Sequence, residues 1–475
     1  MLALIKSHWL TAVFLLLLLS LAACERPSDP AAIVAANPAA ATTPFAPTPT
    51  LASTHLPPPT PDATAVSPAF TPALTPTPTP FYTGPLSPPC GLSLPILPER
   101  TEAAVTELNP DAAALTAVEE IIWPSARPAL QRLLDEPGTV GLAAYRVGDE
   151  ANGIYLNADM QMPLASIVKL LPLVAYSEAV AAGKLDPTST VTLAELEQYY
   201  LPGYDLGSHN RAIRDLREQG RILPNPDRIL LEDVPWMMVR HSSNAAADYL
   251  QMLLGQAAIE ATAVSLGLTA QTAPCPWLGQ FMAMANHTRS GVDDRQAVEG
   301  YLENPDSYGA DAALLTDAFV RDEAFRQVEN EWHRETRRPS VNTQRFFSHN
   351  LNAHGTANEY ADLMARLAQN GLSNGDSSFL ARRYLEWPMV FPDNQELFSN
   401  LGYKNGSLPG ILNTVYYAYP QGETTPVVVV LFYKELPQRT YRQWRYGLPY
   451  DELARWLLAD PQAIPTLRQL VNPKN

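Results

Sequence analysis

A serine and a lysine three residues apart, Ser166 and Lys169, stand at the start of a strongly apolar segment that is long enough for a helix. Residues at this spacing share one helix face, so the lysine amine can reach the serine hydroxyl. A serine needs a base to become a nucleophile near neutral pH, and a desolvated lysine with a lowered pKa can be that base. Free N–H groups and the positive dipole end at a helix start favour a developing anion. By itself, however, such a pair is more often a helix cap beside a solvated charge.

Two later segments carry polar residues of complementary types. Ser242 and Asn244 place a hydroxyl and an amide two residues apart at the start of an apolar helical segment, where Ser242 alone would be read as an N-cap. Lys404, Gly406 and Ser407 precede the last two predicted strands, and alone they would be read as a polar β-turn. The ordinary explanation suffices for any one segment, but all three in this order predict a catalytic site.

Together the segments resemble the three signature elements of serine β-lactamases and penicillin-binding peptidases, which are Ser-x-x-Lys, Ser-x-Asn and Lys-x-Gly. The flanking residues are most similar to the class A β-lactamases. The matching stretches are residues 162–170, 179–193, 242–250 (with Ser243 in place of the usual Asp) and 354–364. The resemblance covers most of residues 125–460, and it implies the fold and the chemistry of that superfamily.

On the nucleophile side, the resemblance implies that Ser166 attacks the substrate carbonyl and that Lys169 acts as its base or tunes the proton relay. Ser242 is then expected to pass a proton toward the leaving nitrogen. Asn244 is expected to hydrogen-bond the substrate amide.

On the strand side, the resemblance implies that Lys404 faces the substrate carboxylate and that Gly406 completes the third signature element. The backbone N–H groups of Ser166 and Ser407 are expected to form the oxyanion hole, which lowers the barrier by a few kcal/mol in such enzymes. Asn405 replaces the usual Thr or Ser, so one carboxylate contact is expected to differ.

Hydrolysis of the acyl-enzyme has no assigned base in this sequence. Class A enzymes use a Glu in a Glu-x-x-Leu-Asn loop, and no such pentapeptide occurs between Asn244 and Thr356. Glu299 comes nearest, because Leu302 follows at the right spacing and Asn304 one place late. A surface acid on a charged helix is the ordinary explanation for Glu299. Without a base, the enzyme is expected to acylate and then release slowly, as a peptidase or a covalent sensor does.

The composition excludes several other classes of function. The net charge is −16 and the sequence contains no basic run, which disfavours nucleic acid as a partner. The histidines lack metal-site spacing, and no glycine-rich phosphate loop is present, so neither a metal nor a cofactor is expected.

The N-terminus predicts a lipid-anchored protein outside the cytoplasm. Residues 1–23 have the charged start, the apolar core and the small residues of a signal peptide, and they end at Cys24. The tetrapeptide that ends at Cys24 resembles the bacterial lipobox, so we expect this cysteine to carry the lipid that attaches the protein to the cell membrane. Residues 24–100 are rich in Pro, Thr and Ala and predict a disordered, semi-rigid tether.

Residues 101–475 are expected to form the hydrolase domain, of the α/β (α+β) class. Strands are predicted at 140–147 and 153–157 and again at 399–403, 412–420 and 425–433, so both ends of the domain contribute to one antiparallel sheet. Helices flank this sheet and a helical subdomain fills the middle of the sequence, as in the β-lactamase/transpeptidase fold. The charged residues 286–345 predict a helical surface insertion.

These features favour a serine hydrolase that cleaves the amide bond of β-lactams through an acyl-enzyme at Ser166. Two alternatives use the same residues: a D-alanyl-D-alanine carboxypeptidase or esterase, and a lipoprotein that binds penicillin or cell-wall peptides without turnover. Cys90 and Cys275 could form a disulfide outside the cytoplasm, although Cys90 lies at the end of the tether and the pairing stays open.

Overall fold

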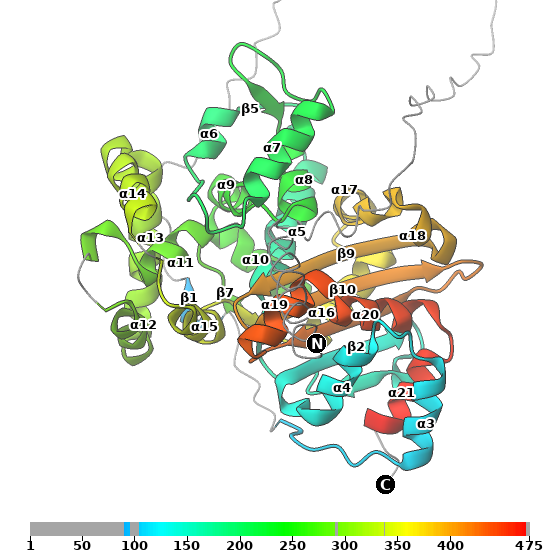
Figure 1. Cartoon of the computed structure of the whole chain (residues 1–475). Helices are drawn as coiled ribbons and strands as arrows, with labels where there is room; N and C mark the ends of the chain where they lie inside the picture. Colours follow the sequence, from blue (N-terminus) through cyan, green and yellow to red (C-terminus); the bar gives the residue numbers. More distant parts are fainter. Residues whose placement is uncertain (1–89, 96–103, 290–292, 337, 472–475) are drawn as a thin grey trace, which may run out of the picture. The chain divides into compact units, whose positions relative to one another are not determined.

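Five strands form one antiparallel sheet in the order β3-β2-β11-β10-β9 (Figure 1). The strands are β2 (Val140–Arg146), β3 (Ile154–Leu156), β9 (Phe398–Leu408), β10 (Ile411–Pro420) and β11 (Val427–Tyr433). The first two come from the start of the domain and the last three from its end, as the sequence predicts. Strand β9 is an edge strand, and this edge carries Lys404.

Successive side chains of the central strands belong to two separate hydrophobic cores. Along β11, Val428, Val430 and Phe432 join one core, whereas the alternate residues of the strand join the other. Side chains of a strand point alternately to its two faces, so each core covers one face of the sheet. Because both faces are covered, β11 is a continuous apolar run that is buried at every position.

Helices from both ends of the domain cover one face of the sheet, and helices from its middle cover the other. The first group is α3 (Ala112–Ile121), α4 (Arg127–Asp135), α19 (Gln438–Gly447), α20 (Pro449–Ala459) and α21 (Ala463–Val471). On the second face, α16 (Ala357–Ala368) contacts β2, β10 and β11. Beyond it lie α5 (Leu170–Ala181), α8 (Asp233–Arg240), α9 (Asn244–Leu254), α10 (Gln256–Leu266) and α17 (Gly375–Leu385).

The remaining elements are short strands, single helical turns and peripheral helices. The short strands pair as β1 (Gly91–Pro95) with β7 (Thr272–Ala273), β4 (Met162–Pro163) with β8 (His354–Gly355), and β5 (Thr190–Thr192) with β6 (Arg228–Leu230). The helices are α6 (Leu193–Glu197), α7 (Ser208–Glu218), α11 (Trp277–Met284), α12 (Asp294–Glu303), α13 (Pro305–Arg321), α14 (Glu323–Glu335), α15 (Val341–Asn350) and α18 (Pro392–Leu397). The 3₁₀ turns are η1 (Pro137–Thr139), η2 (Glu150–Asn152), η3 (Ala165–Lys169), η4 (His287–Arg289) and η5 (Trp387–Val390).

The computed structural model describes residues 90–95, 104–289, 293–336 and 338–471. The predicted signal peptide, the lipid site at Cys24 and most of the predicted tether lie outside these residues. Within them, no helix is both long and apolar enough to cross a membrane.

Three predicted elements differ from the structure in ways that shape the site. The apolar pattern of residues 239–254 predicts one helix, but the structure divides it between α8 and α9 at Ser242, whose φ is 61°. The amphipathic pattern of residues 439–458 also predicts one helix, but it is divided at Leu448, in the left-handed region, and the following Pro449. The strand predicted at 399–403 is longer in the structure, because β9 continues to Leu408 and so includes Lys404.

The predicted insertion consists of helices α12 to α15, and part of it is built into the interior. Tyr308 and Phe319 on α13 are buried in the same core as the nucleophile helix. Gly279 of α11 lies so close to α13 that an added Cβ would stand 2.0 Å from the Ala312 carbonyl oxygen. Helix α13, part of the predicted surface insertion, therefore also supports α11, the helix next to Lys169.

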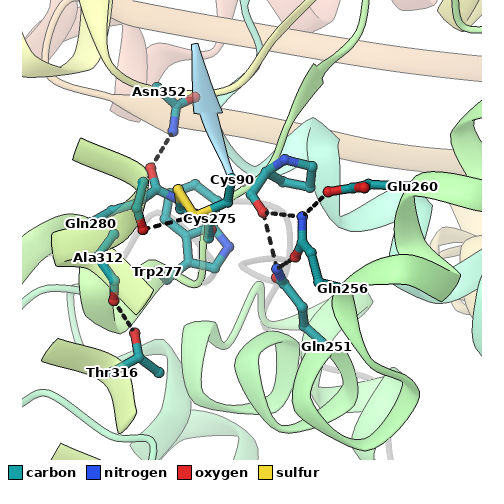
Figure 2. Close-up of a disulfide and its surroundings, with 12 residues drawn as sticks. Cys90, Gln251, Gln256, Glu260, Cys275, Trp277, Gln280, Ala312, Thr316 and Asn352 are labelled. Carbon is teal, nitrogen blue, oxygen red and sulfur yellow. Dashed lines mark hydrogen bonds between the residues drawn. A yellow bond between two sulfur atoms is a disulfide. The ribbon is translucent and has the colours of Figure 1, made fainter. Parts of the chain in front are cut away.

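Cys90 and Cys275 form a disulfide, which settles the pairing that the sequence leaves open (Figure 2). The bond lies beside the pairing of β1 with β7, so the end of the predicted tether is attached to the domain at two adjacent points. Cys275 is followed closely by Trp277, which reaches the site described next.

Candidate active site

Ser166 and Lys169 lie on the 3₁₀ turn η3, directly before helix α5. A 3₁₀ helix has three residues per turn, so residues at i and i+3 lie one above the other. Ala165 has a φ of 49°, a strained conformation for a residue with a Cβ. The Ala165 N–H donates to Asn352 Oδ1 at 2.8 Å, and Asn352 Nδ2 donates to Gln280 Oε1 at 3.2 Å. The turn that presents the serine is therefore held by buried amide side chains.

The Lys169 amine is 1% exposed and lies at the centre of the site. Its Nζ donates to the Ser242 carbonyl oxygen at 2.6 Å and to Asn244 Oδ1 at 2.6 Å, and it lies 3.3 Å from Ser242 Oγ. The Trp277 ring centroid is 4.9 Å away. Burial lowers the Lys169 pKa to about 7, although the carboxylates of Asp248 and Asp205 act in the opposite direction. Above this pH the amine is neutral and can accept a proton.

Ser242 lies between two lysines. Its Oγ is within 3.1 Å of Lys404 Nζ as well as within 3.3 Å of Lys169 Nζ. Burial lowers the pKa of Lys404 well below its usual range, and the nearby Lys169 charge lowers it further. One hydroxyl therefore connects two amines that both favour the neutral form, which is an arrangement suited to passing a proton.

Strand β9 passes directly against the turn that carries Ser166. A Cβ added to Gly406 would lie 2.5 Å from the Leu164 carbonyl oxygen and 3.2 Å from Ala165 Cβ, so only glycine fits at this crossing. Ser407 follows, with its hydroxyl 3.0 Å from the Tyr441 hydroxyl. This close approach brings Ser407 to the turn of Ser166, the two residues whose N–H groups are expected to bind the oxyanion.

Asn405, which stands in place of the usual Thr or Ser, contacts the Lys404 amine. Lys404 Nζ donates to the Asn405 backbone oxygen at 2.8 Å, and Asn405 Oδ1 lies 3.5 Å from the same amine. Hydrogen bonds thus join four of the predicted residues, Lys169, Ser242, Asn244 and Lys404. Ser166 lies on the same turn as Lys169, and Gly406 and Ser407 lie where β9 crosses this turn. The remaining predicted residue, Glu299, lies on α12 with a half-exposed side chain that is paired with Arg295. Glu299 makes no contact with this cluster among the described residues.

Asp248 is a buried acid that the sequence motifs do not indicate. It lies one turn after Asn244 on α9, and its two oxygens accept from the backbone N–H groups of Trp277 and Leu278 at 2.8 and 2.7 Å. Burial raises the Asp248 pKa to about 7, against the effect of these hydrogen bonds and of Lys169. Asp248 therefore holds the Trp277 segment by hydrogen bonds and, through its charge, also raises the pKa of Lys169.

Replacing Asp248 by asparagine should move the rise of acylation with pH toward lower pH. Where Asp248 is ionised, its carboxylate raises the Lys169 pKa, so its loss should lower that pKa and leave more neutral Lys169 at about pH 7. The acylation rate of Ser166, followed by stopped-flow fluorescence with a labelled penicillin between pH 5 and 9, measures the shift. Asp149→Asn, at an exposed position, is the control. A rise at unchanged pH would show that Lys169 is not the titrating base.

His209 is a second buried residue that the motifs do not indicate. Its ring is 0% exposed, with Nδ1 3.0 Å from Ser243 Oγ and Nε2 3.4 Å from a Glu197 carboxylate oxygen. Ser243 in turn caps α9 by accepting from the Ala246 N–H. Because Ser243 stands between Ser242 and Asn244, His209 fixes the loop that presents both residues to Lys169.

Replacing His209 by phenylalanine should slow acylation about tenfold or more, since small misplacements of catalytic groups are costly. Asparagine can still hydrogen-bond Ser243 and should restore part of the rate. A fall in the maximal acylation rate, with little change in the penicillin concentration that gives half of that rate, would identify a positioning role for His209. Equal losses in both variants would instead indicate only a packing defect.

Within residues 90–95, 104–289, 293–336 and 338–471, no group of three or more His, Cys, Asp or Glu side chains could hold a metal ion.

An antiparallel sheet between two helical layers, with a serine and a buried lysine on the turn beside its edge strand, defines the serine hydrolases of the β-lactamase/transpeptidase fold. The chain belongs to the beta-lactamase enzyme family, whose model matches residues 125–444. It is therefore a hydrolase of the serine β-lactamase superfamily.

Several solved structures are similar to the chain at low identity. A β-lactamase from Sphaerobacter thermophilus DSM 20745 is 18% identical over 74% of this chain and 97% of that one, with a TM-score of 0.40. A β-lactamase from Chitinophaga pinensis DSM 2588 is 13% identical over 72% and 98%, with a TM-score of 0.43. The protein PBP-A is 13% identical over 77% and 98%, with a TM-score of 0.39. No curated protein matches the chain.

Proposed function

We propose that this protein opens β-lactam amide bonds by forming an ester at Ser166. The observation that carries the proposal is the buried Lys169 amine, which has a pKa of about 7 and lies within hydrogen-bond distance of both Ser242 and Asn244. Neutral Lys169 accepts the Ser166 proton as Oγ attacks the carbonyl carbon. The C–N bond then breaks, and the leaving nitrogen takes a proton through the Ser242 hydroxyl. The N–H groups of Ser166 and Ser407 bind the oxyanion.

Release of the acyl group should be slow compared with its formation. Asp248 is the buried acid beside Lys169, but both of its oxygens accept backbone N–H groups. Among the described residues, no carboxylate is hydrogen-bonded to Ser166, Lys169 or Ser242. Hydrolysis of the ester needs a base for the attacking water, so the intermediate should accumulate.

The lack of an engaged carboxylate favours a second candidate function. A D-alanyl-D-alanine carboxypeptidase or a related esterase uses the same serine, lysines and hydroxyl. Such an enzyme would be trapped by penicillin as a long-lived ester and would turn over its own peptide.

The test is to incubate the domain with a fluorescent penicillin and with a chromogenic cephalosporin. We expect a label that persists and maps to Ser166 by mass spectrometry, is absent in Ser166→Ala, and is accompanied by slow cephalosporin turnover. Rapid turnover without an accumulating label would contradict slow release. Release of D-alanine from a D-alanyl-D-alanine peptide would establish the second candidate. No Ser166-dependent label with any substrate would overturn the shared mechanism.

We also propose that the protein is a lipoprotein held at the outer side of the cell membrane by lipid on Cys24. The proposal depends on the sequence of residues 1–24, and the Cys90–Cys275 disulfide supports an oxidising compartment. Metabolic labelling with a radioactive fatty acid should mark the wild-type chain and not Cys24→Ala. Label retained in the variant would exclude this cysteine as the site.

A further inference from the structure

A small cavity lies where β9 ends and turns into β10. It has a volume of about 100 Å³, and the turn Pro409-Gly410 lines it together with Arg345 of α15 and with Tyr441 and Arg442 of α19. Helix α15 belongs to the predicted insertion. The insertion and the C-terminal part of the domain therefore meet at this cavity.

The cavity adjoins the part of the site that contains Ser407. The Tyr441 hydroxyl is 3.0 Å from the Ser407 hydroxyl, and Pro409 follows Ser407 by two residues. Helix α15 also contacts β4, which ends just before the turn of Ser166. Phe347 of α15 is in the core of the nucleophile helix, whereas Tyr441 is in the core on the other face of the sheet. The cavity thus lies at the end of the sheet, between the two layers, and not behind one face.

The backbone of β9 directs a bound substrate along the outer edge of the sheet. The two-residue turn Pro409-Gly410 makes Leu408 and Ile411 the pair that closes the hairpin, so Leu408 turns its backbone groups to β10. Backbone groups of successive residues in an antiparallel pair point alternately to the partner strand and away from it. Ser407 therefore turns its N–H and C=O groups to the outer edge, as binding of the oxyanion requires.

The order of the expected contacts along β9 shows which part of the substrate reaches the cavity. Lys404 is expected to face the carboxylate, which in a penicillin is on the leaving-group side of the scissile bond. Ser407, three residues later, donates to the carbonyl oxygen in the proposed mechanism. The acyl side then continues past Ser407 and reaches the turn after two residues, or about 7 Å at the rise of a strand.

Two guanidinium groups at the cavity have no acidic partner. In the part of the chain that the structure describes, neither Arg345 nor Arg442 forms an ion pair, although the net charge of the chain is −16. Arg345 donates to the Leu436 carbonyl oxygen, and Arg442 makes no hydrogen bond among the described residues. Each guanidinium carries five N–H donors, so both keep donors for an anion. The planar group of N–H donors matches a carboxylate.

The size of the cavity favours an aliphatic chain over a ring. A closed cavity that holds benzene has a volume of about 150 Å³, which is larger than the 100 Å³ here. A chain of methylene groups that ends in a carboxylate suits both the volume and the charge.

We propose that this cavity binds the carboxylate of an aliphatic acyl group, with Arg345 and Arg442 as its cationic partners. The site then favours acyl donors whose acyl side chain ends in a carboxylate over neutral donors of the same length. The inference rests on the proposed acylation of Ser166, and it gives α15 of the insertion a role in substrate selection.

Two penicillins with the same nucleus test the inference, one with an adipoyl side chain and the other with the methyl ester of that side chain. Competition of each with the fluorescent penicillin gives the second-order rate constant for acylation of Ser166. The wild-type protein should react about ten- to a hundredfold faster with the free acid, as expected for charge-assisted contacts. Arg345→Gln and Arg442→Gln should each lose about tenfold on the acid and little on the ester. Arg345→Lys keeps the charge without the planar group and should lie between.

Arg439→Gln is the matched control, because it removes an exposed charge from α19 that does not line the cavity. It should change both rates by no more than about twofold. The ester rate also reports the fold of each variant, and Arg442 is exposed, so its replacement tests the cavity even if Arg345→Gln unfolds. Equal rates for the two penicillins in the wild-type protein, or a preference kept in Arg442→Gln, would overturn the proposed carboxylate site. Absence of any Ser166 label would overturn the proposed function as well, whereas a labelled protein without the preference overturns only the cavity.

Discussion

Alanine in place of Lys169 should slow acylation of Ser166 by about a thousandfold, within the range for loss of a general base. The amine is fully buried, and burial lowers its pKa to about 7, so it is the group that can take the serine proton near neutral pH. Stopped-flow fluorescence with a labelled penicillin gives the acylation rate. In the wild-type protein this rate should rise as pH increases through about 7, because Lys169 loses its proton there, and in the variant the rise should be absent.

Controls separate the loss of the base from damage to the fold. Lys169→Met keeps most of the side-chain volume between Ser242 and Trp277 and should be as slow as the alanine variant. Lys184→Ala, at an exposed lysine after α5, should acylate normally. If Lys169→Met retained the wild-type rate, or kept the rise near pH 7, another group would be the base and the role of Lys169 would be refuted.

The residues that carry the chemistry could be predicted from sequence because each signature element is local. Ser166 and Lys169 are one helical turn apart, and Ser242 and Asn244 frame one loop, so short-range spacing fixes their relation. The positions of the strands along the chain could also be predicted, because alternating or continuous apolar runs such as β11 indicate burial directly.

What the sequence did not predict depends on contacts between distant segments. Asp248 looks like an ordinary helical residue until α11 places two N–H groups on its carboxylate. His209 lies 34 residues before Ser243, and only the fold brings its ring to the hydroxyl. Likewise, the Asn405-Gly406 pair is typical of turns, but pairing with β10 keeps it extended. Tertiary contacts override local preference at each of these positions.

Removing the Cys90–Cys275 disulfide should reduce both the stability of the domain and its acylation rate. The bond closes a loop with a sequence separation of 185 residues, so its loss frees many conformations of the unfolded chain and should lower the free energy of unfolding by about 3–5 kcal/mol. Acylation should fall as well, because Cys275 anchors the segment whose Trp277 ring contacts Lys169 and whose N–H groups bind Asp248. Figure 2 shows this segment beside the bond.

The Cys90→Ala/Cys275→Ala variant and the wild-type protein, each with and without a thiol reductant, give a complete comparison by urea unfolding and penicillin labelling. The reductant should bring the wild-type protein to the midpoint of the variant and leave the variant unchanged. Hydrogen bonds of Gln280 hold the same segment independently of the disulfide. Its side chain donates to the Cys275 carbonyl oxygen at 2.6 Å and accepts from Asn352, which holds Ala165 beside the nucleophile. If the variant unfolds earlier but labels at the wild-type rate, those hydrogen bonds alone position the segment, and the disulfide acts only on stability.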